Sequence, residues 1–296
     1  MPELPEVETI VQQLHKEITG KAINDIWTDY PKSLKGNLSL TKFSKNVIGQ
    51  KITKVIRRGK NILIFLENNL IILVHLKLTG HFLIGKYSRV NESWQPPKGN
   101  LSDPANSFIH WVFSLSDGRQ LALSDKRKFI KIMLLKQSDL DRIEDLKIGI
   151  DPLSPEFTLE LLVNLLKSSN KSIKDFLLDQ KFIAGIGNIY ANEILWEAQI
   201  SPFVKTREIT FPETKALHQA IIKILRNAIK HQGTSAQDEA YRTIQGEKGG
   251  YSQFLKVYQR ENQPCFRCHQ LIKRIKEKSR STFYCPVCQK VAEKCK

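Results

Sequence analysis

The 296-residue sequence contains no apolar run that approaches the length of a membrane-spanning helix, and its first residues are acidic and rich in proline. A membrane span needs roughly 20 consecutive apolar residues, and a secretion signal opens with a basic region followed by an apolar one. These absences argue against both a membrane protein and a signal peptide. We therefore expect a cytoplasmic protein with no membrane partner.

Cysteine is missing from most of the chain, because all five cysteines lie at or beyond position 265. This distribution does not fit a secreted fold held together by disulfides. Four of the five form two Cys-x2-Cys pairs separated by 16 residues: Cys265, Cys268, Cys285 and Cys288. Four thiolates in this pattern suit a tetrahedral Zn²⁺ site with a closed coordination shell. We predict one structural Zn²⁺; two local disulfides or free thiols are the alternative, and Cys295 is left over.

Acidic residues are in deficit, with 30 Asp+Glu against 46 Lys+Arg and a formal net charge of +16. Such a surplus predicts a polyanionic partner, most commonly nucleic acid. Charge alone does not separate DNA from RNA or from an acidic membrane surface. Between the cysteine pairs lies a group of five cations: Lys273, Arg274, Lys276, Lys278 and Arg280. A β-hairpin carrying them would suit a groove of DNA, although a solvated charged hairpin is the alternative.

The first half of the chain has the pattern of β structure. Short apolar runs bounded by turn residues occur at 62–66, 70–74, 108–115 and 120–123. Asn68-Asn69 predicts a hairpin whose turn takes positive φ, and strands at this spacing favour a β-sandwich. A helix is predicted over 6–18, where apolar residues share one face. Residues 86–106, rich in Pro, Asn, Ser and Gly, are predicted to form a mobile loop.

The pattern changes near residues 149–155, where two prolines break regular structure. Helical periodicity follows, with helices predicted over 159–167, 173–178, 188–197 and 214–231. The glycine-containing segment 233–252 is predicted to be a flexible loop. The sequence therefore predicts a multidomain α+β protein, divided into an N-terminal β-sandwich with flanking helices (1–135), a linker (136–155), a helical domain (156–257) and a zinc-bearing β-hairpin (258–296).

The first residues suggest amine chemistry. Removal of Met1 would leave Pro2 with a free secondary amine, and an α-amino group titrates at about 8, against about 10.4 for lysine. Roughly a tenth of the former is neutral at pH 7, and a nearby helix N-terminus lowers the amine pKa further. Such an amine can form a Schiff base, with Glu3 and Glu6 as carboxylates for proton transfer. From composition alone, a capped helix start is the more conservative interpretation.

The opening Met1–Thr9 closely resembles that of bacterial formamidopyrimidine-DNA glycosylases. Further segments resemble motifs of this family in the family's order: the catalytic-lysine loop (57–60), the void-filling loop (75–80), the second intercalation loop (125–129), the start of the long helix of the helix–two-turns–helix motif (186–193), a glycine-containing segment (233–235) and the zinc ribbon (257–288). Any one of these could arise by chance, but the ordered set is highly specific.

The resemblance implies a base-excision-repair enzyme for damaged double-stranded DNA, monomeric, bacterial and associated with the nucleoid when bound to DNA. It implies a two-layered β-sandwich, a helix–two-turns–helix domain and a zinc ribbon. In the implied reaction Pro2 attacks C1′ of the damaged nucleotide, expels the base and forms an iminium, after which β- and δ-elimination cut the strand. Glu3 would be the general acid/base, Glu6 would support the site, and Lys60 would hold a phosphate.

The damaged base must leave the stack, because its sugar cannot be reached inside the duplex. The resemblance assigns three side chains to fill the gap: Leu78, Arg127 and Phe129. An apolar wedge and an aromatic ring would offset the lost stacking, while the guanidinium would pair with the orphaned base. Asn188, at a predicted helix N-terminus, and Arg280 would bind phosphates. The loop 233–251 would close over the flipped base.

Three positions depart from the family pattern and leave the lesion preference open. Leu78 stands where methionine is usual, Thr79 where many relatives carry glutamate or serine, and Ile130 where glycine follows the phenylalanine. We expect oxidised purines, formamidopyrimidine or 8-oxoguanine, as the substrate. The alternatives are an endonuclease VIII-like enzyme for oxidised pyrimidines and a catalytically silent DNA-binding relative, although the presence of both Pro2 and Glu3 argues against silence.

Overall fold

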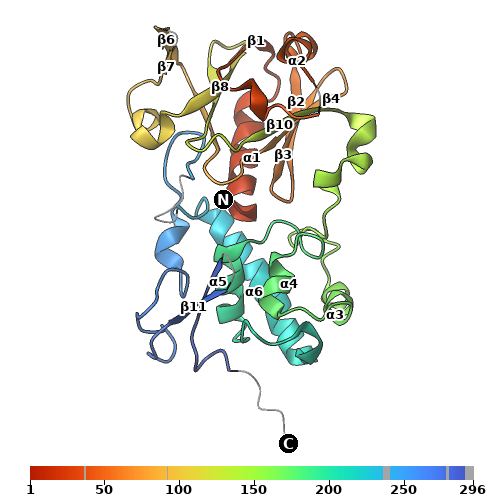
Figure 1. Cartoon of the computed structure of the whole chain (residues 1–296), viewed down its shortest axis with the longest axis vertical. Helices are drawn as coiled ribbons and strands as arrows, with labels where there is room; N and C mark the ends of the chain where they lie inside the picture. The colour runs from red at the N-terminus through yellow and green to blue at the C-terminus, as the bar shows by residue number, and fades with distance from the viewer. Residues whose placement is uncertain (37, 92, 236–240, 278–279, 291–296) are drawn as a thin grey trace, which may run out of the picture. The chain divides into compact units, whose positions relative to one another are not determined.

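The computed structural model describes residues 1–36, 38–91, 93–235, 241–277 and 280–290 (Figure 1). The chain divides into two compact units, of which the first contains Met1–Lys147 and His231–Ser252 and the second contains Ile148–Lys230 and Gln253–Lys296. Strands dominate the first unit and helices the second, so the predicted multidomain α+β class is confirmed. No helix in the described part of the chain combines the length and apolar character needed to cross a membrane.

The first unit is built on two four-stranded antiparallel sheets. One has the order β1 (Ile23–Thr28), β8 (Ile109–Leu115), β9 (Gln120–Ser124), β5 (His81–Gly85). The other has the order β10 (Lys131–Lys136), β4 (Leu70–His75), β3 (Asn61–Leu66), β2 (Ile52–Arg58). β3 and β4 are joined through Asn69, whose φ is +60°, so the predicted hairpin turn is confirmed.

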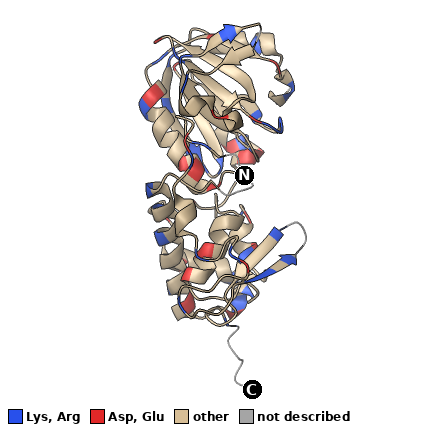
Figure 2. Ribbon diagram, turned by 90° about the vertical axis from the view of Figure 1, so that its left-hand side faces the viewer, with Lys and Arg blue, Asp and Glu red and all other residues tan. Residues whose placement is uncertain are grey.

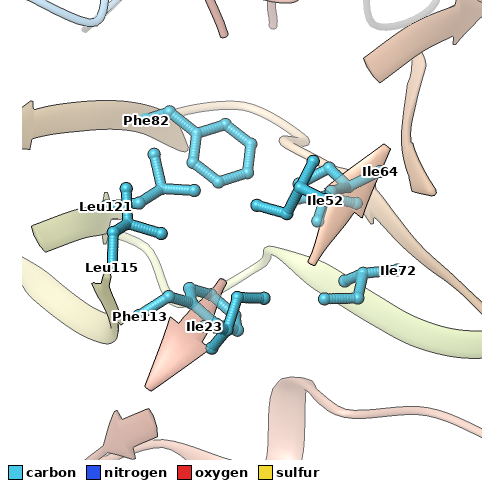
Figure 3. A pocket seen from close by; sticks show the side chains of 9 residues that line it. Ile23, Ile52, Ile64, Ile72, Phe82, Phe113, Leu115 and Leu121 are labelled. Atoms are coloured by element: carbon cyan, nitrogen blue, oxygen red, sulfur yellow. The ribbon is translucent and has the colours of Figure 1, made fainter. Parts of the chain in front are cut away.

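The main core lies between the two sheets and under helix α1 (Leu4–Ile18). Apolar side chains from both sheets converge there around a narrow gap (Figure 3): Ile23, Ile52, Ile64, Ile72, Val74, Phe82, Phe113, Leu115 and Leu121. Helix α2 (Leu40–Val47) adds Phe43, which packs edge-on against Trp111. Because side chains alternate across a strand, each sheet also has an outer face that must be covered.

The outer face of the β10-β4-β3-β2 sheet is covered by residues that the sequence assigned to a linker. The 3-10 helices η4 (Gln137–Arg142) and η5 (Glu144–Leu146) bring Leu146 onto Leu63 and Phe65. This second apolar contact explains why all six residues of β3 are buried. The first part of the predicted linker is therefore packed structure.

Residues 86–106 cover the outer face of the other sheet, so the mobile loop predicted there is wrong for the described residues. They contain strands β6 (Ser88–Val90) and β7 (Ser93–Gln95) and the 3-10 helices η2 (Asn100–Ser102) and η3 (Pro104–Asn106). Trp94 meets Trp27 edge-on with a centroid distance of 6.1 Å. Aromatic packing on an exposed sheet face outweighs the loop-like composition.

Residues 231–252 pack with the β-sandwich unit, although the sequence placed them in the helical domain and predicted a flexible loop over 233–252. Tyr241 and Ile244 are buried in the main core. Ile244 also extends the sheet region, since its carbonyl accepts the N–H of Ile84 at 2.9 Å. The flexible-loop prediction is therefore wrong for the described part of this segment; residues 236–240 lie outside the described residues.

The described part of the second unit contains four α-helices: α3 (Leu159–Lys167), α4 (Ile173–Leu178), α5 (Asn188–Glu197) and α6 (Phe211–Lys230). Hydroxyl caps start two of them, since Thr158 and Ser172 accept backbone N–H groups in the first turns of α3 and α4, as short polar residues do at helix starts. The C-terminal part of the unit contains a hairpin of β11 (Lys273–Glu277) and β12 (Arg280–Tyr284).

The short 3-10 helices complete the elements. They are η1 (Pro31–Ser33) in the first unit, η6 (Thr206–Glu208) in the second, and η7 (Tyr251–Phe254). The four predicted domain ranges stay a prediction. They are consecutive stretches of sequence, whereas each compact unit is defined by contacts and combines two separate stretches.

Candidate active site and nucleic-acid interface

The first residues of the chain form a buried helix N-terminus that contains two acidic side chains. Pro2 is buried, Glu3 is the N-cap residue of α1, and Glu6 lies fully buried in the first turn. The N–H of Glu3 donates to Glu6 Oε2 at 2.8 Å. Pro5 suits the first turn because its missing N–H has no intrahelical partner to lose. The helix dipole favours carboxylates at this end, so the two acidic residues are held without burying unpaired charge.

Glu6 also binds the returning segment near residue 234. Its Oε1 accepts the N–H of Thr234 at 2.7 Å. The residue before it must be glycine, because Gly233 has a φ of +77° and a Cβ there would lie 2.8 Å from Glu6 Oε1. Burial, reinforced by the charge of Glu6, raises the pKa of Tyr241 well above its usual range. Tyr241 therefore stays a neutral phenol beside this carboxylate.

Lys60 lies in the tight turn between β2 and β3, next to Gly59, which has a φ of +58°. Its side chain is only 8% exposed. The turn is connected to α1 by Arg57, which donates to Glu8 Oε2 at 2.7 Å and to the carbonyl of Gly59 at 3.4 Å. Arg57 therefore connects the turn that carries Lys60 to helix α1 within the first unit.

A neutral histidine lies beside this turn. Burial, followed by the charges of Lys77 and Lys60, lowers the pKa of His75 to about 4. Its Nδ1 accepts the N–H of Lys77 at 3.0 Å, which orients the start of the β4–β5 loop. The cationic character of this region therefore comes from its lysines, while the ring of His75 stays uncharged at neutral pH.

Two loops present the three predicted gap-filling side chains to solvent. Leu78 in the β4–β5 loop is 38% exposed, and Phe129 in the β9–β10 loop is 53% exposed. Arg127 is exposed in the same loop. Large apolar side chains left in solvent are informative when they gather with cations, and Lys126 and Lys128 flank Arg127. Both loops belong to the first unit.

Sequence reasoning gave no role to Asp125, which directly follows β9 and is buried. Its carboxylate accepts backbone N–H groups of Phe129 and Ile130 at 2.6 and 2.8 Å. The available signal was an acidic residue between a buried strand and a run of three cations, 126–128. Here the acidic side chain holds the β9–β10 loop in place by accepting its backbone N–H groups.

In the second unit, Asn188 is the first residue of α5. Its Nδ2 donates to the carbonyl of Ser281 at 3.1 Å, while its Oδ1 has no hydrogen-bond partner among the described residues. Lys174 makes a similar connection, since its Nζ donates to Ser281 O at 2.9 Å and to Thr282 Oγ1 at 2.8 Å. These contacts place Asn188 directly beside β12, where Arg280 is exposed.

Two further buried polar side chains attach the zinc-bearing segment predicted from residue 258 onward, here called the C-terminal module, to α5. Sequence reasoning missed both. Asn192 Oδ1 accepts the N–H of Phe283 at 2.9 Å. Glu193 accepts the consecutive N–H groups of residues 256–258 at 2.7 to 2.9 Å. Burial raises the pKa of Glu193. Asn192 and Glu193 therefore attach both β12 and the start of the module to α5.

The four predicted zinc ligands come together, with their Sγ atoms all within 4.8 Å of one another. The Sγ atoms of Cys268 and Cys285 are 3.3 Å apart, and those of Cys265 and Cys288 are 3.9 Å apart. Thiolates at about 2.3 Å from a tetrahedral Zn²⁺ lie about 3.8 Å from one another. All four are free thiols, so the disulfide alternative is wrong for them, and they fit one structural Zn²⁺. Cys295 lies outside the described residues.

The hairpin between the two cysteine pairs is basic on both strands. Figure 2 shows Lys and Arg along it, and the side chains of Lys273, Arg274 and Lys276 are exposed on β11. Arg274 donates from Nε to Ser281 Oγ at 3.0 Å across the strand pair. A cationic hairpin between two pairs of cysteines that fit Zn²⁺ is suited to phosphate contacts.

Three family models match the chain in order. They are the formamidopyrimidine-DNA glycosylase N-terminal domain over residues 1–132, the formamidopyrimidine-DNA glycosylase H2TH domain over residues 148–240, and the zinc finger found in FPG and IleRS over residues 262–291. Together they span both compact units and the cysteine cluster.

Whole-chain relatives agree with these models. The formamidopyrimidine-DNA glycosylase of Pelotomaculum thermopropionicum is 38% identical over 292 residues, which cover 98% of this chain and 100% of the relative. The crystal structure of the MutM (Fpg) protein of Thermus thermophilus has a TM-score of 0.82 at 32% identity, covering 97% of this chain and 98% of that one. A Lactococcus lactis Fpg mutant, crystallised with Fapy-dG-containing DNA, has a TM-score of 0.84 at 32% identity, covering 98% and 100%. The predicted resemblance is thereby confirmed, and the chain belongs to the formamidopyrimidine-DNA glycosylase family of DNA-repair enzymes.

Proposed function

We propose that this glycosylase also has AP lyase activity, with Pro2 as its nucleophile and oxidised purines in duplex DNA as its substrates. The observation that supports the proposal best is the start of α1, where Pro2 and Glu3 are buried beside Glu6. Glu6 accepts N–H groups from two segments, which suits it to hold the chain start in one position. A fixed amine next to a carboxylate is the arrangement that Schiff-base catalysis requires.

The reaction begins once Met1 has been removed. The neutral Pro2 nitrogen forms a bond to C1′, and the bond from C1′ to the base breaks, with its electron pair leaving on the base, which takes up a proton. The nitrogen then loses its proton, and its lone pair forms the C1′=N iminium as the bond from C1′ to the ring oxygen breaks, with Glu3 transferring a proton to that oxygen. The iminium acidifies the 2′ hydrogens; loss of one expels the 3′ phosphate, and a second elimination expels the 5′ phosphate.

The DNA-binding roles are proposed residue by residue. Lys60, whose stem is covered, would hold a phosphate of the damaged strand with its ammonium group. The gap left by the base would receive Leu78, Arg127 and Phe129. Arg280 would bind a phosphate that flanks the lesion. Asn188 would also bind phosphate there, and its side-chain amide orients β12. We further expect a monomer that acts on the bacterial nucleoid.

Borohydride trapping on a duplex with a single abasic site tests the nucleophile. The wild-type protein should form a covalent adduct, and Pro2→Gly should keep its duplex affinity but lose most of the trapping. Mass spectrometry of the purified protein should show that Met1 is absent. Retained Met1, or unchanged trapping in a Pro2→Gly, Lys60→Ala double variant, would reject the proposed nucleophile and favour a silent DNA-binding relative.

A lesion panel decides the substrate. The Lactococcus relative was crystallised with Fapy-dG-containing DNA, and we expect formamidopyrimidine and 8-oxoguanine duplexes to be cleaved first. A further solved complex of that relative holds DNA with an oxidised pyrimidine, so the endonuclease VIII-like alternative is tested in the same series. Faster excision of oxidised pyrimidines than of either purine lesion would assign the chain to that alternative.

A further inference from the structure

The β9–β10 loop is wrapped around one buried carboxylate. Asp125 is 1% exposed, and its Oδ2 accepts the backbone N–H groups of Phe129 and Ile130 at 2.6 and 2.8 Å. Its Oδ1 accepts the N–H of Arg127 at 3.2 Å. Lys128 takes a φ of +56° at the tip, which lets the chain curl back. Backbone N–H groups converging in this way stabilise a negative charge, so the loop conformation depends on Asp125.

The β4–β5 loop reaches the same carboxylate through one hydroxyl. Thr79 donates its Oγ1 hydrogen to Asp125 Oδ1, and the same Oγ1 accepts the N–H of Arg127 at 3.2 Å. A hydroxyl has a single hydrogen to donate, and here it is used inside the protein. Thr79 is therefore placed as a positioning residue between two loops rather than as a donor to a flipped base.

A packing contact joins the same two loops. Ile130 is buried, and its side chain lies against Gly80, where a built Cβ would be 2.6 Å from Ile130 Cγ1. The same Cβ would be 2.4 Å from the carbonyl of Leu76, which accepts the N–H of Gly80 at 3.1 Å. Ile130 thus fills the space between the two loops.

We propose that Thr79, Asp125 and Ile130 form an inter-loop contact that fixes the spacing of the gap-filling side chains before DNA binds. Leu78 directly precedes Thr79, and Phe129 directly precedes Ile130, so each exposed tip is one residue away from the contact. Ordering the tips in advance lowers the cost of inserting them into the base stack. The inference rests on the proposed function and adds positioning residues for lesion extrusion.

The test compares Thr79→Val, which keeps the shape without the hydroxyl, with Thr79→Ser, which keeps the hydroxyl. The first readout is the ratio of lesion-excision rate to abasic-site trapping rate under single-turnover conditions, because trapping needs no base extrusion. The second readout is the fluorescence of 2-aminopurine beside the lesion, measured in a Pro2→Gly background where no cleavage interferes. Thr206→Val is the matched control, since its buried hydroxyl donates to Ser169 O at 2.6 Å in the other unit.

Thr79→Val should lower the excision-to-trapping ratio about tenfold and slow the fluorescence rise by a similar factor. Thr79→Ser should stay within about twofold of the wild type, and Thr206→Val should leave the ratio unchanged while lowering stability. An unchanged ratio in Thr79→Val, a failure of serine to restore it, or equal losses of excision and trapping would overturn the inference. If the wild type does not trap at all, the nucleophile proposal fails, and the fluorescence rates still decide on the inter-loop contact.

Discussion

Replacing Glu6 by glutamine is the sharpest test of how the chain start is held. The Glu6 carboxylate accepts the N–H of Glu3 at 2.8 Å with one oxygen and the N–H of Thr234 at 2.7 Å with the other. Glutamine retains one acceptor oxygen and sets an NH₂ group against the second N–H. The variant is nearly isosteric, so packing changes contribute little.

The magnitude follows from these two contacts. Loss of one hydrogen bond to a charged acceptor costs about 1.5–3 kcal/mol, and a buried N–H left without an acceptor costs about 1–3 kcal/mol. Removing a buried charge offsets part of this, so a net loss of about 2–3 kcal/mol is expected. For a unit of this size 1 kcal/mol corresponds to about 2–4 °C in Tm. The unfolding transition of the first unit should therefore fall by roughly 5–10 °C.

Differential scanning calorimetry measures the shift, and hydrogen exchange at the Thr234 amide reports on the contact itself. Glu8→Gln is the matched control, because Glu8 lies on the same helix but pairs with Arg57 at a partly exposed position. Its replacement should cost at most about 1 kcal/mol. Equal Tm changes in the two variants, or unchanged protection of the Thr234 amide in Glu6→Gln, would refute the reasoning.

Three further outcomes are expected. Burial lowers the pKa of His75 and of His81 to about 4, below the unfolded value of about 6.5, so the folded chain binds fewer protons than the unfolded chain between these values. The contribution of the two histidines to the free energy of unfolding should therefore be fully present above pH 6.5, and it should fall by about 2 kcal/mol per histidine from pH 7 to pH 5. A free energy of unfolding in urea that is independent of pH in this range would contradict this. Cys268→Ser should lose bound zinc and duplex affinity together, as measured by metal analysis and fluorescence anisotropy, and full affinity without metal would separate the hairpin from DNA binding. Duplex affinity should fall steeply with salt, with a log–log slope of about −0.9 for each phosphate neutralised; a flat dependence would count against a phosphate-binding surface.

Local patterns in the sequence were sufficient to predict most of the helices and strands of the structure. The predicted helices over 159–167, 173–178 and 188–197 have the same bounds in the structure, and the apolar runs match β3, β4, β8 and β9 within one residue or so. The cysteine spacing alone led to the metal site. Each of these signals is carried by residues that are close together in the chain, where periodicity and spacing are informative.

The remaining features depend on partners far away in the sequence. The hydroxyl of Thr79 meets Asp125 across 46 positions, and Lys174 meets Ser281 across 107. Residues 233–252 have the composition of a loop, but Tyr241 and Ile244 complete a core that starts at Val7. No local pattern reveals such pairings. The gap-filling and phosphate-binding roles came from the family resemblance, which also favoured the Pro2 nucleophile that amine chemistry had suggested, and all of these roles remain proposals.

The discontinuous first unit has a consequence for synthesis on the ribosome. Residues 148–230, which belong to the other unit, are translated before the segment that supplies Thr234, Tyr241 and Ile244. Until that segment has emerged, the nascent β-sandwich lacks two core side chains and the N–H group that Glu6 accepts. A fragment that stops at residue 147 should therefore be aggregation-prone, and the chain start should acquire its final geometry only after about five-sixths of the protein has been made.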